Sequence, residues 1–106
     1  MQLFETMKSP FPKETYEKNA QVYKLLASPI RLEILNILKN KETSVDQLTK
    51  LLGIRKPNVS QHLSLLRHAG LIKTRKKGLN VYYNIINPEI VKPCKILHDL
   101  RVANII

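Results

Sequence analysis

The stretch from Ile54 to Tyr83 constrains the fold most strongly, because its apolar residues change from helical to alternating spacing. Its first half predicts a helix whose apolar stripe, Val59, Leu63 and Leu66, lies beside a face of short polar side chains. Gly70 is the expected stop of this helix. Two short alternating runs follow, joined by a cationic tip at Arg75–Gly78. We therefore expect a helix beside a two-stranded hairpin.

A second helix is predicted immediately before this one. Ser44 and Gln47, three residues apart, match a capping box, in which two side chains satisfy free backbone amides at a helix start. Gly53 should end this helix. Its expected apolar face consists of Leu48, Leu51 and Leu52. With the helix expected from about 56 to 68 or 69, it predicts a helix-turn-helix over about residues 44–69.

Two further helices should precede this unit. Residues 1–13, with two prolines, predict a partly ordered arm. The helix expected over about 14–27 carries one apolar stripe, formed by Tyr16, Ala20, Tyr23 and Ala27. Ser28-Pro29 is a strong start signal for the next helix, which should run to about Lys39. Its inward residues are expected to be Ile30, Ile34, Leu35 and Leu38.

The C-terminal segment predicts one more helix. Pro93 inside a helix that began at Pro88 would cost about 3 kcal/mol, so we favour a short turn at 88–91 followed by a helix over about 93–104. This helix is more apolar than one side of a terminal helix requires, which suggests a subunit interface. Residues 1–106 thus predict one mainly helical domain: four helices, a small β-hairpin wing over about 71–86, and a fifth helix.

The charge distribution favours a polyanionic partner. The chain carries a net charge of +10, and residues 47–88 contribute eight basic residues and no acidic one. Such a concentration of charge is expected for a nucleic-acid-binding surface. A solvated lysine-rich surface is the alternative, but it usually includes acidic residues for internal pairing.

Other features narrow the class of protein. The single cysteine, Cys94, allows no internal disulfide, which fits a reducing cytosol and a cytoplasmic location. The N-terminus has no charged start with an apolar core, and no apolar run approaches the roughly 20 residues that span a bilayer. The sequence shows no phosphate-binding glycine loop, paired carboxylates or activated nucleophile, so we expect neither an enzyme nor a cofactor.

Three stretches resemble the ArsR/SmtB family of winged-helix repressors. Leu26–Leu35 is similar to the entry of the family's second helix, and Asn58–Ile72 to its recognition helix and the turn after it. Arg75–Gly78, followed by Val81–Tyr83, resembles the wing. The resemblance covers about residues 15–102. It implies a homodimer joined through the first and last helices that binds a palindromic operator, usually as a repressor.

The recognition helix should place short polar side chains against base edges in the major groove. The candidates there are Lys56, Asn58, Ser60, Gln61 and Ser64. The expected contacts with the DNA backbone or minor groove are Arg67, Arg75, Lys76, Lys77 and Asn80. His62 is also a candidate, but we favour a structural role for it, packed near the helix-turn-helix core and hydrogen-bonded to backbone or phosphate.

The resemblance does not extend to the family's usual metal sites. One site needs cysteines where this chain has Ser44 and Asp46. The positions of the other site hold a single carboxylate, in the set Asn87, Glu89, Leu100 and Ala103. A sensor built on an intrasubunit cysteine pair is excluded, because Cys94 is the only cysteine.

Cys94 and His98 are weak metal candidates. They stand four residues apart in the last predicted helix, so both side chains could reach one ion, and a symmetric dimer could supply four ligands. The alternative, which we favour, is a cysteine packed in an apolar interface with His98 at its rim.

Two other functions fit the same residues. One is an architectural nucleic-acid-binding protein with weak sequence preference, which would show a steep salt dependence without selectivity. The other is a winged helix used for protein interaction, whose partner binding should survive loss of Gln61 or Arg75.

Overall fold

The computed structural model describes residues 7–106. The expected N-terminal arm therefore lies partly outside the described residues. Residues 7–12 precede the first helix without regular structure. No helix among the described residues is long and apolar enough to cross a membrane.

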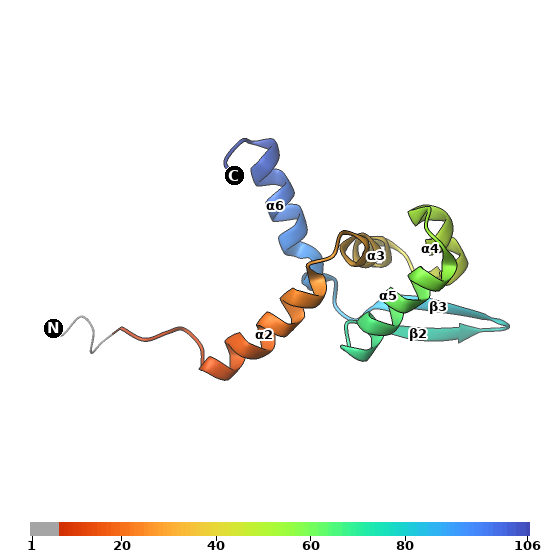
Figure 1. Ribbon diagram of the computed structural model, residues 1–106, viewed down its shortest axis with the longest axis horizontal. Coiled ribbons are helices and arrows are strands. Elements are labelled where there is room, and N and C mark those ends of the chain that lie inside the picture. Colours follow the sequence, from red (N-terminus) through yellow and green to blue (C-terminus); the bar gives the residue numbers. More distant parts are fainter. Residues whose placement is uncertain (1–6) are drawn as a thin grey trace.

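Residues 7–106 contain five α-helices, one 3₁₀ turn and three strands. The helices are α2 (Lys13–Leu26), α3 (Pro29–Asn40), α4 (Val45–Leu52), α5 (Lys56–His68) and α6 (Lys92–Val102), and η1 (Pro88–Val91) is the 3₁₀ turn. The strands are β1 (Thr43–Ser44), β2 (Ile72–Lys77) and β3 (Asn80–Ile85). Figure 1 shows α3, α4 and α5 gathered beside the β2–β3 hairpin, with α2 and α6 projecting away. This arrangement confirms the predicted mainly helical winged-helix class.

The local start and stop signals act as expected. The Ser28 side chain accepts a hydrogen bond from the Arg31 amide at 3.3 Å. Ser44 and Gln47 form the complete capping box, with contacts of 3.2 and 3.0 Å. Gly53 follows α4 in the left-handed conformation, with φ of 66°. At the C-terminal end, η1 precedes a new helix that holds Pro93 in its first turn, as favoured from the sequence.

The strand β1 was not predicted. It pairs antiparallel with β3, Thr43 opposite Tyr83 and Ser44 opposite Tyr82, to give a sheet of order β1-β3-β2. Two residues are too few to show an alternating pattern, so the sequence carries no signal for it. The pairing holds the segment between α3 and α4 against the base of the wing.

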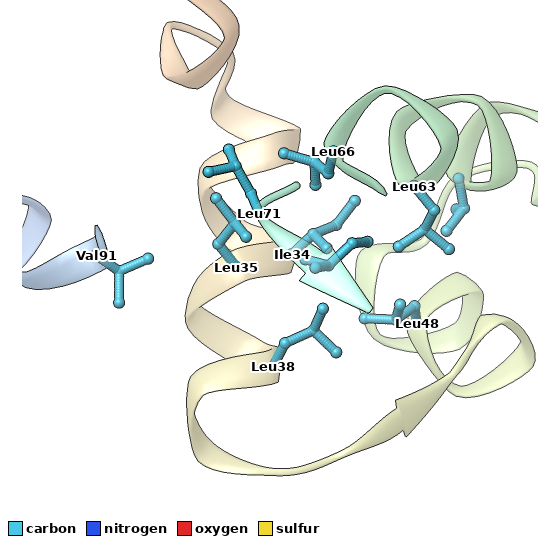
Figure 2. Packing of buried hydrophobic residues seen from close by; sticks show 10 residues of the cluster. Ile34, Leu35, Leu38, Leu48, Leu63, Leu66, Leu71 and Val91 are labelled. Atoms are coloured by element: carbon cyan, nitrogen blue, oxygen red, sulfur yellow. The ribbon is translucent and has the colours of Figure 1, made fainter. Parts of the chain in front are cut away.

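The hydrophobic core lies where α3, α4, α5 and the first residues of β2 meet. Side chains from these elements point toward one another around Ile34 in Figure 2. The buried residues are Ile34, Leu35, Leu38, Leu48, Val59, Leu63, Leu66, Leu71, Ile72 and Val91. One expectation was wrong: Leu51 does not join Leu48 and is 64% exposed. It faces outward and lines a hollow with Ile37 of α3.

The helices α2 and α6 contribute little to this core. Neither contains a buried residue, and both extend from the compact part of the chain (Figure 1). The radius of gyration is 17.6 Å, against about 13 Å for a compact domain of about 100 residues. Apolar side chains on both helices are exposed, including Tyr16, Tyr23, Ile96 and Leu97. The two helices therefore present apolar surface without covering it within the chain.

Candidate nucleic-acid interface

The helix α5 separates a buried apolar face from an exposed polar one. Val59, Leu63 and Leu66, at spacings of four and three, are buried against the core. The polar candidates on this helix are all exposed: Lys56, Asn58, Ser60, Gln61, Ser64 and Arg67. The packing of α5 thus turns a continuous row of hydrogen-bonding groups toward solvent.

Lys56, at the start of α5, is engaged in an ion pair. Its Nζ lies 2.8 Å from Oδ1 of Asp46 in the first turn of α4, and both side chains are more than half exposed. The hydrogen bond and charge of Lys56, followed by the charge of Lys50, lower the pKa of Asp46. An exposed pair of this kind contributes little to stability. Lys56 can therefore exchange Asp46 for a phosphate at small cost.

His62 is half-buried, unlike the exposed polar candidates on α5. Its Nδ1 lies 3.2 Å from Nη1 of Arg31 on α3. Burial, and then the positive charge of Arg31, lower the pKa of His62. The contact with α3 supports the structural role that the sequence favoured over direct reading of a base.

The cationic run in the wing is divided between two faces of the hairpin. Arg75 pairs with Tyr82, Lys76 with Val81, and Lys77 with Asn80 across the strands. Successive residues of a strand point to opposite faces, and cross-strand partners share a face. Arg75 and Lys77 therefore lie on one face and Lys76 on the other, with Asn80 at the end of the hairpin next to the turn. The sequence analysis grouped these residues as backbone or minor-groove contacts without dividing them between two faces.

The Arg75 guanidinium is bound by Glu42, which the sequence reasoning missed. Its Nε donates to Oε2 of Glu42 at 2.8 Å, and its Nη2 donates to Oε1. Asn84 Nδ2 also donates to Oε2 of Glu42, at 2.9 Å. The Arg75 hydrogen bonds, followed by the one from Asn84, lower the pKa of Glu42 to about 2. Glu42 lies 33 residues before Arg75, and the pairing of β1 with β3 brings the two together.

A hollow of about 600 Å³ separates the wing from the helix-turn-helix. Arg67 of α5 and Lys76 of β2 both line it, together with Asp46 at the start of α4. The structure thus brings one cation of the helix and one of the wing to the same depression. Two cations around such a hollow suit a backbone phosphate.

Cys94 and His98 differ in their exposure to solvent. Cys94 is half-buried and lines an apolar groove of about 410 Å³ between α2, α3 and α6, whereas His98 is exposed. Within residues 7–106, no group of three or more histidine, cysteine or acidic side chains is placed to hold a metal ion.

Comparison with known proteins gives a consistent result. Residues 28–74 match the family described as bacterial regulatory protein, arsR family. The chain is 36% identical over 86 residues to the transcriptional repressor PagR of Bacillus anthracis, covering 80% of this chain and 86% of that protein. It is 34% identical over 96 residues to the transcriptional activator HlyU of Vibrio cholerae, covering 87% and 89%. A match of 35% identity to the regulator KmtR of Mycobacterium tuberculosis covers 76% of this chain but 62% of KmtR.

Solved structures agree with the sequence matches. The structure of HlyU from Vibrio cholerae gives a TM-score of 0.74 at 34% identity and covers 84% of this chain and 97% of that one. A homodimeric winged helix-turn-helix DNA-binding domain from Mycobacterium bovis gives a TM-score of 0.76 at 24% identity, covering 93% and 94%, and shows the shared fold.

Proposed function

Because the chain belongs to the ArsR family of DNA-binding transcriptional regulators, we propose that it is a homodimeric repressor that binds a palindromic operator. The observation that carries this proposal is the polar face of α5, which the buried stripe of the same helix turns outward beside a basic wing. The family consists of transcription regulators and not of enzymes.

The proposed dimer interface is formed by α2 and α6. Neither helix has a buried residue. The apolar side chains of Tyr23 on α2 and Leu97 on α6 are 64% and 46% exposed, and these two side chains line the same groove as Cys94. A small domain gains stability by covering such surface with a second copy. A two-fold dimer presents two α5 helices in opposite senses, and a palindrome has the same symmetry.

Sedimentation velocity tests this interface. Because Tyr23 and Leu97 are not buried within the chain, changing either to Glu should leave the fold intact and shift the protein to monomer. Leu79→Glu is the matched control, since Leu79 is fully exposed at the wing tip, far from both helices. Dimers that persist in both interface variants would contradict the assignment.

On DNA, we propose that Lys56, Asn58, Ser60, Gln61 and Ser64 face base edges. Asn and Gln can pair bidentately with adenine, and Lys suits guanine or phosphate. Backbone contacts are assigned to Arg67, Arg75, Lys76, Lys77 and Asn80, and the role assigned to His62 is structural. The exposure of the α5 residues and the hollow shared by Arg67 and Lys76 support this division.

The direction of regulation is part of the proposal, since PagR is named a repressor and HlyU an activator. In vitro transcription from a promoter that overlaps a duplex selected for binding tests it. We expect purified protein to reduce the transcript, and an increased transcript would contradict repression.

The proposed repressor works without the family's usual metal sites. Ser44 and Asp46 stand where thiolate ligands would be needed, and Ser44 is already used as the cap of α4. Zinc content measured after stoichiometric addition and gel filtration should be close to zero per dimer. Retained zinc that disappears in a Cys94→Ser variant would show that Cys94 and His98 form a site.

A further inference from the structure

We propose that Arg31 and His62 are positioning residues that connect the dimerisation helix α2 to the recognition helix α5 and thereby set the spacing of the two half-sites. The inference rests on the proposed homodimer and palindromic operator. It assigns to this pair a role in geometry that is separate from base contact. Three contacts carry it: one from Arg31 to each of α2 and α5, and one that anchors its backbone.

Arg31 holds the C-terminal end of α2. The last carbonyl groups of a helix have no amide partner within the helix. Leu25, in the last turn of α2, has such a carbonyl, and it accepts a hydrogen bond of 2.6 Å from Nε of Arg31. The backbone amide of Arg31 donates to the Ser28 side chain at the start of α3. Arg31 is therefore fixed at the corner between α2 and α3 by both its backbone and its side chain.

The same guanidinium reaches α5. Its Nη1 lies 3.2 Å from Nδ1 of His62. A guanidinium is planar and its donors have a fixed arrangement, so the bond to Leu25 also sets the direction of the bond to His62. His62 accepts this bond only when its Nδ1 carries no proton. Burial, and then the charge of Arg31, lower the pKa of His62 and so favour the neutral imidazole, whose Nδ1 can accept this bond.

The position of His62 on α5 means that its contact with Arg31 acts on the orientation of the exposed face of this helix. His62 follows the exposed Gln61 and precedes the buried Leu63. The buried contacts of α5 with the core are made by apolar side chains, and the Lys56–Asp46 ion pair with α4 is exposed to solvent. The bond to Arg31 adds a directional restraint on the rotation of α5 about its axis. Since α2 is proposed to contact the partner subunit, the restraint fixes the orientation of each α5 relative to the two-fold axis of the dimer.

A simpler role is that Arg31 only caps α2 and stabilises the fold. This role predicts that variants of Arg31 unfold more easily but keep the preference of the dimer for one distance between the half-sites. The two roles are separated by operators in which the distance between the half-sites is altered. One base pair moves a half-site along the axis and rotates it about the duplex, because B-DNA repeats in about 10 base pairs.

The test measures binding to a palindrome selected from random duplexes and to versions with one base pair inserted or removed at the centre. Wild-type protein should prefer the selected spacing. His62→Leu, which lacks the acceptor, and Arg31→Lys, which keeps the charge but lacks the fork, should lose at least about fivefold of that preference, a change of about 1 kcal/mol. His62→Gln, which offers an oxygen acceptor, should retain it. Discrimination against a base change within a half-site should be equal in all four proteins.

Sedimentation velocity and urea unfolding establish that each variant is a folded dimer under the binding conditions. Variants that keep the wild-type spacing preference would overturn the inference and leave the proposed function standing. Loss of base discrimination in His62→Leu would also overturn it, because His62 would then read a base. Wild-type protein that prefers no palindrome over scrambled DNA would overturn the proposed function and this inference together.

Discussion

Replacing Lys76 and Lys77 with Ala should reduce the salt dependence of DNA binding. Neither lysine forms an ion pair with a carboxylate among the described residues, so each can neutralise one phosphate. Each phosphate contact adds about 0.9 to the slope of log K against log salt. The four lysines of a dimer therefore add about 3.6 to this slope. Between about 50 and about 200 mM salt, wild type should thus lose about a hundredfold more affinity than the variant.

Fluorescence anisotropy with a labelled duplex over this salt range measures the slope. Arg75→Ala should change the slope less, because Glu42 already neutralises much of the charge that it removes. Lys8→Ala with Lys13→Ala is the charge-matched control, since α2 begins at Lys13 and this end of α2 points away from the wing (Figure 1). An equal reduction in this control, or an unchanged slope in the wing variant, would refute a role of the wing in phosphate binding.

Three further outcomes are expected. Gln61→Ala should weaken the free energy of binding to the selected operator by about 1–3 kcal/mol and change binding to scrambled DNA little. Equal losses of affinity on both duplexes, measured by fluorescence anisotropy, would show that Gln61 does not contact a base. Leu48→Ala should lower the free energy of unfolding by about 2–5 kcal/mol in urea titrations, because Leu48 is fully buried, whereas the same change at the exposed Leu51 should have a small effect. The lowered pKa of His62 means that the unfolded chain binds more protons below about pH 6.5. Stability should therefore fall as the pH drops below that value, and fall less in His62→Gln; equal pH profiles would contradict the assigned environment.

The helix boundaries could be predicted because their signals are local. Ser28 and the pair Ser44 and Gln47 cap helices from within three residues, and Gly53 ends one by its own backbone conformation. Pro93 likewise restricts where the last helix can start. Such signals depend on neighbours in the chain and do not require the tertiary structure.

The side-chain contacts between distant residues at the candidate DNA-binding surface could not be predicted. Glu42 and Arg75 are 33 residues apart, and Arg31 and His62 are 31 apart. Each pair meets only after the sheet has formed or α3 has packed against α5. The spacing of Leu51 from Leu48 suggests a shared buried face, but α4 turns Leu51 toward a hollow beside α3. Periodicity identifies an apolar side chain and not the partner that covers it.

The ratio of affinities for a selected palindromic duplex and a scrambled duplex of equal length and composition, measured at physiological salt, tests the central claim most directly. A dimeric regulator that reads bases through the exposed face of α5 should show a ratio of roughly 10³ or more. A ratio near one, with binding that only weakens steeply as salt rises, would contradict sequence recognition and indicate an architectural role.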